Sequence, residues 1–122
     1  MATILIVEDN PTNMTLAAYV LESAGHSVLK ATDAEAGLTL AREALPNLIL
    51  MDIQLPGMDG LEATAHLKAN AATRAIPVIA LTALAMKGDE ERIRAAGCDG
   101  YIAKPMRYQE FLAAIATQLA QA

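Results

Sequence analysis

The sequence predicts an α/β sandwich, in which helices cover a parallel β-sheet. Wholly apolar runs such as Leu48–Met51 are typical of strands that are buried on both faces of such a sheet. These runs alternate with stretches whose apolar residues recur at helical spacing. Five strand patterns alternating with five helix patterns indicate a parallel sheet between layers of helices.

The first half of the chain contains three strand patterns, which are Ile4–Val7, Ser27–Ala31 and Leu48–Met51. After the first strand, Asn10 or Thr12 is expected to cap a helix that Gly25 ends. The segment Thr32–Glu35 has the spacing of a capping box and opens a second helix. The apolar residues expected on the inner side of this helix are Leu38, Ala41 and Leu45.

The second half continues the alternation. A weaker helix pattern covers Leu61–Ala71, with Leu61 and Ala65 as its expected anchors. The fourth and fifth strand patterns are Pro77–Leu81 and Tyr101–Ala103. The helix between them carries acidic residues first and basic residues last, as its dipole favours, and Gly97 closes it. A last helix is indicated by the apolar stripe Phe111, Leu112, Ile115 and Leu119.

Length, charge and cysteine content restrict the class of protein. The 122 residues suffice for one domain, so we expect a single domain over residues 1–122. The net charge of −5, with nine scattered Lys and Arg, argues against a nucleic-acid surface. Cys98 is the only cysteine, which suits a reducing cytoplasm. No apolar stretch approaches the roughly 20 residues that span a bilayer, so we expect no membrane insertion.

Polar residues of useful types end four of the five apolar runs. Glu8 and Asp9 follow the first strand, Asp52 the third, Thr82 the fourth and Lys104 the fifth. Parallel strands bring these ends to one edge of the sheet, where three carboxylates would repel one another unless a cation intervenes. Mg²⁺ is the most plausible cation, because it prefers oxygen ligands. A carboxylate, a metal, a hydroxyl and an ammonium group together suit phosphoryl transfer.

Each of these residues has a commoner role when it is taken singly. Asp52, for example, precedes a loop marked by Pro56 and Gly57, and aspartates in such places often only accept hydrogen bonds from loop amides. The coincidence of four strand ends is what favours a functional site over this structural role.

Two segments, LMDIQLPGMDG and LTALAMKGDEERIRAAGCDGYIAKP, accompany the ordered set Glu8, Asp9, Asp52, Thr82 and Lys104. This combination resembles the receiver domain of two-component response regulators over nearly the whole chain, and it is most similar to stand-alone receivers of the DivK type. The resemblance implies a flavodoxin-like (βα)5 three-layer sandwich with a five-stranded parallel sheet of order 2-1-3-4-5. It also implies signalling through a phosphorelay.

By matching position, the resemblance implies that Asp9 and Asp52 bind Mg²⁺ together with the main-chain carbonyl of Gln54. Glu8 would act on the metal through water. Many receivers carry Asp at the position of Glu8, and the longer side chain is expected to be tolerated because it still reaches a metal-bound water.

The resemblance also implies the phosphoryl chemistry. Asp52 would take a phosphoryl group from a histidine kinase or a histidine phosphotransferase. Thr82 would bond the phosphoryl oxygens, Lys104 would pair with them, and Tyr101 would be the mobile aromatic residue of the switch. We expect a downstream protein to bind the face formed by the fourth helix, fifth strand and fifth helix. The only activities expected are self-catalysed phosphorylation and dephosphorylation, so the chain is not classed as an enzyme.

Other functions are weighed against this one. The chain could be the receiver piece of a longer hybrid kinase or regulator, or an interaction domain that is not phosphorylated. A phosphatase of the haloacid dehalogenase kind would need a second Asp two residues after the first, where this chain has Gln54. A phosphate-loop nucleotide binder is excluded, since neither GxxxxGK nor GxGxxG follows the first strand.

Overall fold

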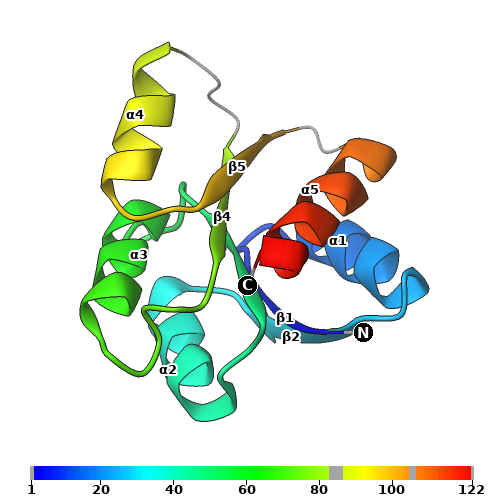
Figure 1. The fold of residues 1–122 in the computed structure, drawn as a ribbon, viewed down its shortest axis with the longest axis horizontal. Helices are drawn as coiled ribbons and strands as arrows, with labels where there is room; N and C mark the ends of the chain where they lie inside the picture. The colour runs from blue at the N-terminus through cyan, green and yellow to red at the C-terminus, as the bar shows by residue number, and fades with distance from the viewer. Residues whose placement is uncertain (1, 83–86, 105–106, 122) are drawn as a thin grey trace.

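The computed structural model describes residues 2–82, 87–104 and 107–121, in which strands and helices alternate (Figure 1). The elements in chain order are β1 (Thr3–Val7), α1 (Pro11–Ser23), β2 (Ser27–Ala31), α2 (Ala34–Ala44), β3 (Leu48–Asp52), α3 (Gly60–Ala69), β4 (Val78–Thr82), α4 (Lys87–Ala95), β5 (Gly100–Ala103) and α5 (Tyr108–Gln121). Every strand and helix that the sequence predicted is therefore present, with bounds shifted by a few residues.

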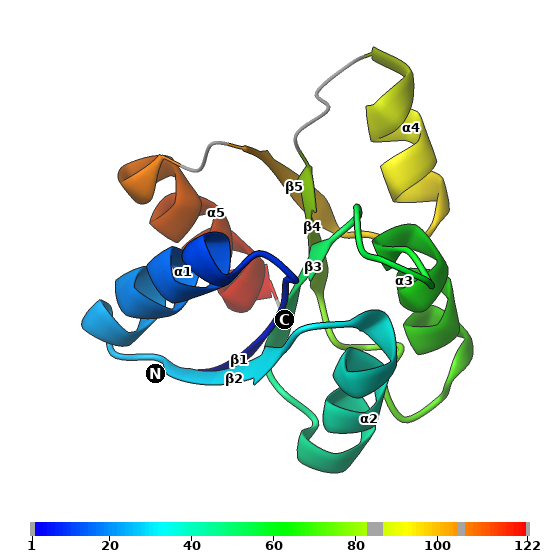
Figure 2. The ribbon, with the colours of Figure 1, turned by 180° about the vertical axis from the view of Figure 1, so that it is seen from behind.

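The strands form one parallel sheet in the order β2-β1-β3-β4-β5. Helices α1 and α5 cover one face, and α2, α3 and α4 cover the other (Figures 1 and 2). The three-layer sandwich and the strand order 2-1-3-4-5 are thus confirmed. None of the helices in the described part of the chain is long and apolar enough to cross a membrane.

Successive residues of each inner strand face opposite layers, as the pleat of a strand requires. In β1, Leu5 and Val7 pack in the core beneath α2 and α3, whereas Ile4 and Ile6 pack beneath α1 and α5. All five residues of β3 and of β4 are buried. This burial on both faces explains why the inner strands are continuous apolar runs in the sequence.

Three local expectations are wrong. The cap of α2 is Asp33, whose Oδ1 accepts a hydrogen bond from the main chain of Ala36 at 2.7 Å, so Thr32 does not open a capping box. Leu45 is 54% exposed, because the helix has already ended in a left-handed residue at this position, with φ of 46°. Ala65 lies on the exposed side of α3, whose buried residues are Gly60, Ala63, Thr64 and Leu67.

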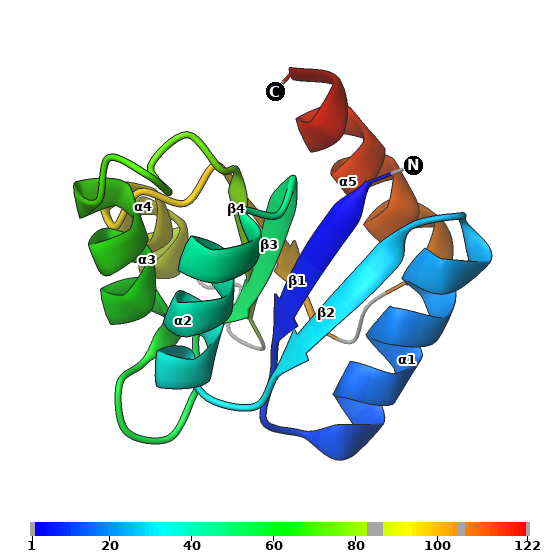
Figure 3. The ribbon, with the colours of Figure 1, turned by 90° about the horizontal axis from the view of Figure 1, so that it is seen from below.

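The strand register aligns the carboxyl ends of the inner strands. Val7 is paired with Met51, so that Glu8 follows β1 beside Asp52 at the end of β3. Asp52 is in turn paired with Leu81, which precedes Thr82 at the end of β4. Figure 3 shows β1 and β2 running side by side toward the same edge. Polar residues that are far apart in the sequence consequently meet at one edge of the sheet.

Candidate functional site

Three carboxylates meet at the carboxyl edge of the sheet. Glu8 and Asp9 directly follow β1, and Asp52 is the last residue of the neighbouring β3. Each offers a carboxylate oxygen, and these oxygens all lie within 4.8 Å of one another. Glu8 and Asp52 are buried, whereas Asp9 is exposed. The structure therefore brings together the acidic residues that the sequence placed at this edge.

Lys104 places an ammonium group between two of these carboxylates. Its Nζ lies 2.9 Å from Oε2 of Glu8 and 3.1 Å from Oδ2 of Asp52, and its side chain is only 16% exposed. The main-chain N–H of Lys104 donates to the carbonyl of Thr82 at 2.7 Å, so the lysine continues the pairing of β5 with β4. This pairing positions the main chain of Lys104 so that its side chain reaches Glu8 and Asp52.

The close packing of these charges shifts the pKa values of Glu8 and Lys104. Burial raises the pKa of Glu8 above its ordinary value, and the neighbouring Asp52 carboxyl raises it further, while Lys104 opposes both effects. Burial by itself would lower the pKa of Lys104, but the bonds to Glu8 and Asp52 outweigh it and the pKa is raised. Lys104 is therefore charged at neutral pH and partly neutralises the two buried carboxylates.

The position of Asp52 is held from two sides. Its Oδ1 accepts a hydrogen bond from the main-chain N–H of Gln54 at 2.9 Å. On the other side, α3 begins at Gly60 directly against the main chain of Asp52 and Ile53. A Cβ at Gly60 would lie 2.7 Å from Cα of Ile53 and would also collide with the carbonyl of Asp52. Only glycine allows this approach.

Sequence reasoning missed part of the roles of Asn10 and Gly60. Of the two predicted caps, Asn10 and Thr12, it is Asn10 that caps α1, by accepting a hydrogen bond from the main chain of Asn13 at 3.0 Å. Its own main-chain N–H also donates to Oε1 of Glu8 at 3.2 Å, which ties the start of the helix to the site. An acidic residue two positions before a helix cap is the local signal for this contact. For Gly60, the sequence shows only a glycine in a loop.

A hollow of about 440 Å³ opens at this edge. The residues that line it come from the β1–α1 segment, the end of β3 and the residue after β5, and they are Glu8, Asp9, Asn10, Pro11, Asn13, Asp52, Gln54 and Lys104. The predicted metal ligands and Lys104 therefore share one solvent-facing space. The donor set fits a hard divalent cation, because carboxylate oxygens are the ligands that Mg²⁺ prefers.

The two predicted switch residues lie elsewhere. Thr82 is buried at the end of β4 and does not line this hollow. Thr82 lies at the end of the strand next to that of Asp52, because Asp52 pairs with Leu81, the residue before Thr82. Tyr101 lies on β5, is 36% exposed and lines a different hollow of about 240 Å³.

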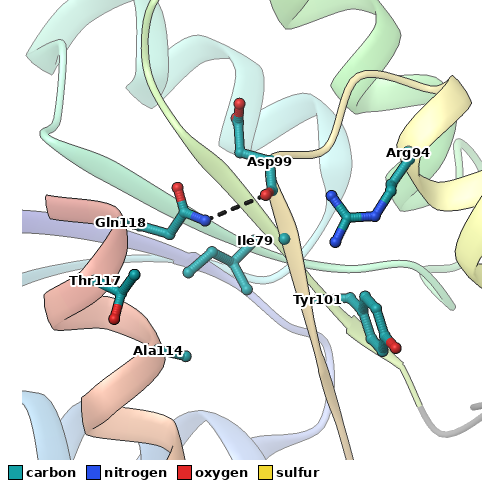
Figure 4. Close-up of a pocket in the computed structure, with 8 residues that line it drawn as sticks. Ile79, Arg94, Asp99, Tyr101, Ala114, Thr117 and Gln118 are labelled. Atoms are coloured by element: carbon teal, nitrogen blue, oxygen red, sulfur yellow. Dashed lines mark hydrogen bonds between the residues drawn. The ribbon is translucent and has the colours of Figure 1, made fainter. Parts of the chain in front are cut away.

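This second hollow lies between α4, β5 and α5, the face on which the sequence placed a partner. Figure 4 shows the guanidinium of Arg94 and the ring of Tyr101 on one side and residues of α5 on the other. The Nε2 of Gln118 donates to the carbonyl of Asp99 at 3.2 Å and closes one end. Figure 1 shows that β5 runs between the two helices, so a change in this strand would affect both walls.

Comparison with known proteins identifies the family. The sequence model of the response regulator receiver domain matches residues 4–116. The chain belongs to the response regulator receiver domain family. The polar-differentiation response regulators DivK of Brucella anthropi and Brucella ovis are each 49% identical to it, over 98% of this chain and 98% of their own length. These relatives favour a response regulator over the other functions weighed from the sequence.

Solved receiver structures have the same fold. The receiver domain of a sensor histidine kinase from Pseudomonas aeruginosa is 37% identical, with a TM-score of 0.91 over 98% of both chains, and holds a magnesium ion coordinated in its active-site cleft. A CheY-like receiver domain protein from Methanospirillum hungatei is 31% identical, with a TM-score of 0.89 over 99% of this chain and 95% of its own.

Proposed function

We propose that this receiver domain is a phosphorylation-activated signalling switch and that Asp52 is its phosphoryl acceptor. The observation that carries the proposal is the place of the Asp52 carboxylate, which is buried, lines the edge hollow, contacts Lys104 and lies close to the acidic pair Glu8 and Asp9. Among these carboxylates, Asp52 alone is itself the last residue of a strand, β3, whereas Glu8 and Asp9 follow the end of β1.

The reaction is a direct transfer. An oxygen of Asp52 attacks the phosphorus of a phosphohistidine on a kinase or phosphotransferase. A P–O bond forms as the P–N bond breaks, and the imidazole leaves with the bonding electron pair. Mg²⁺, held by Asp9, Asp52 and the carbonyl of Gln54 with Glu8 acting through water, would supply positive charge at the transferring phosphoryl group. Attack by water on the same phosphorus later releases phosphate and restores the carboxylate, which is the self-catalysed dephosphorylation.

Lys104 and Thr82 are proposed to recognise the phosphorylated state. Lys104 already contacts Oδ2 of Asp52 at 3.1 Å, so its ammonium is placed to pair with phosphoryl oxygens on that carboxylate. The hydroxyl of Thr82, at the end of the adjacent strand, would donate to another phosphoryl oxygen. Such a charge-assisted hydrogen bond contributes about 1.5–3 kcal/mol. That is enough for a coupling of roughly 5–150-fold between two states.

The output is proposed to pass through protein contacts. If Thr82 is drawn toward the phosphoryl group, space beside β5 changes, and Tyr101 would turn from its half-exposed position toward the sheet. The hollow between α4, β5 and α5 would then change shape, and a downstream protein would bind there. Such a domain would act in the cytoplasm, where kinase and target meet it.

Intact-mass measurement after incubation with acetyl phosphate and Mg²⁺ tests the acceptor. We expect a single phosphoryl adduct on the wild type, and none with Asp52→Asn or in EDTA. Asp59→Asn is the matched control, because Asp59 is exposed in the loop after β3 and Asn can still cap α3. An adduct that survives Asp52→Asn would contradict the assignment.

A further inference from the structure

Glu8 is one methylene longer than aspartate, and its carboxylate reaches both Lys104 and the main chain of Asn10. Its Oε2 lies 2.9 Å from Nζ of Lys104, a shorter contact than the 3.1 Å between Lys104 and Asp52. Its Oε1 accepts the main-chain N–H of Asn10 at 3.2 Å. Both oxygens of Glu8 are therefore bonded to groups of the chain itself.

Asp52 is engaged in the same way. Its Oδ2 is bonded to Lys104 and its Oδ1 to the main chain of Gln54. The four oxygens of the two buried carboxylates thus each have an internal donor, and the Lys104 ammonium is their shared counter-ion. In this arrangement the Lys104 ammonium neutralises part of the negative charge of Glu8 and Asp52.

We propose that the Glu8–Lys104 ion pair competes with Mg²⁺ and sets the metal affinity of this site. The inference rests on the proposed function, since it concerns the metal that Asp52 and Asp9 would hold. Glu8 is 1% exposed, and a buried charge that loses its partner is strongly destabilised. A second cation near Asp52 repels the Lys104 ammonium, so metal binding must weaken the ion pair between Lys104 and Glu8.

The length of Glu8 is the decisive feature. Shortening it to aspartate withdraws the carboxylate by about 1.5 Å, the length of one C–C bond. The 2.9 Å contact with Lys104 would then be lost, while the negative charge stays at the edge of the sheet. The number of carboxylates available to the metal would be unchanged. The Lys104 ammonium would be held by Asp52 alone, and the metal would displace it more easily.

A double-mutant cycle on Mg²⁺ affinity tests this, measured by isothermal titration calorimetry at one pH and ionic strength. Glu8→Asp should tighten Mg²⁺ binding at least about fivefold in the wild-type background, the lower end of typical couplings between two ligands. The same substitution should have little effect when Lys104→Met has removed the competing ammonium. Glu22→Asp, on the exposed side of α1, is the control and should leave affinity unchanged.

Equal effects of Glu8→Asp in the two backgrounds, or weaker binding in the wild-type background, would overturn the competition and leave Glu8 as a plain participant in metal binding. If Lys104→Met does not fold, as judged by circular dichroism, Lys104→Gln removes the charge in its place. A wild-type protein that binds no Mg²⁺ would instead overturn the metal-assisted function proposed above, and this inference with it. The two failures are therefore distinguishable.

Discussion

The two edges of the sheet each hold a lysine–aspartate ion pair, and the pairs differ in what surrounds them. At the carboxyl edge, Lys104 and Asp52 are 3.1 Å apart; at the amino edge, Lys68 and Asp99 are 3.0 Å apart. The distances are nearly equal. Residue type and separation alone therefore do not distinguish the pair at the proposed phosphorylation site from the pair at the opposite edge.

The amino-edge pair is built into the main chain. Lys68 also donates to the carbonyls of Arg74 at 3.2 Å and Ile76 at 2.9 Å, and the same Asp99 oxygen accepts the main-chain N–H of Val78 at 2.8 Å. The carboxyl-edge ammonium instead bonds two side-chain carboxylates beside an open hollow. Replacing either partner of the Lys68–Asp99 pair would also remove hydrogen bonds that hold the main chain before β4 and at its start. The Lys104–Asp52 pair instead faces the hollow, where we propose that a ligand replaces its partners.

The largest effect that would sharpen this comparison is on metal binding. Asp9→Asn should weaken Mg²⁺ binding at least about tenfold, because even groups that only support a metal ligand typically contribute 10–100-fold. Asp33→Asn, an exposed cap on α2, should leave affinity unchanged. Calorimetric titration measures both. Equal affinities of Asp9→Asn and the wild type would remove Asp9 from the site.

The next effect concerns the response to phosphorylation. Thr82→Ala should still accept phosphate on Asp52 but lose the gain in partner binding, a change of roughly 5–150-fold. NMR chemical shifts of Tyr101, with and without the phosphate mimic BeF₃⁻, follow the ring, and Thr82→Ser is the control that keeps the hydroxyl. A Thr82→Ala protein that responds as fully as the wild type would break the proposed coupling.

At the amino edge, the expected effect is on stability alone. Asp99→Ala should lower the free energy of unfolding by about 1–3 kcal/mol, because it leaves the N–H of Val78 without its acceptor. Asp99→Asn keeps an acceptor and should cost less. Urea denaturation measures both variants, and mass analysis should show normal phosphorylation. Loss of phosphorylation in a folded Asp99 variant would contradict the division between the two edges.

The smallest effect is a pH dependence near the amino terminus. Nδ1 of His26 accepts the main-chain N–H of Ala2 at 3.2 Å, and burial lowers the pKa of His26 below its ordinary value. The folded state favours the neutral ring, so its contribution is present above the unfolded pKa of about 6.5 and is lost as pH falls through the folded pKa.

Unfolding measured between pH 8 and pH 5 should show a loss of no more than about 1 kcal/mol from this contact. The loss should be absent in His26→Gln and retained in His66→Gln, which changes an exposed residue of α3. The same slope in all three proteins would remove His26 as its cause.

The sequence by itself determined the class of fold and the residue types at the ends of the strands. Apolar runs such as Leu48–Met51 are local patterns, and burial on both faces leaves few other residues that a central strand can use. The ordered set of acidic, hydroxyl and lysine residues was readable for the same reason, since each member lies at the end of a strand or just after it. The family resemblance then supplied the strand order, which alternation alone does not give.

The tertiary structure alone decided which of these residues touch. Lys104 bonds Glu8 across 96 positions of sequence, and its bond length depends on the register of four strands, which no local pattern encodes. The same holds for Gly60, whose need for glycine arises only where α3 meets the main chain of Asp52. Leu45 is a case in which a local sequence pattern gave a wrong prediction. Helical periodicity placed it inward, but the left-handed turn at that residue ends the helix and directs the side chain into solvent.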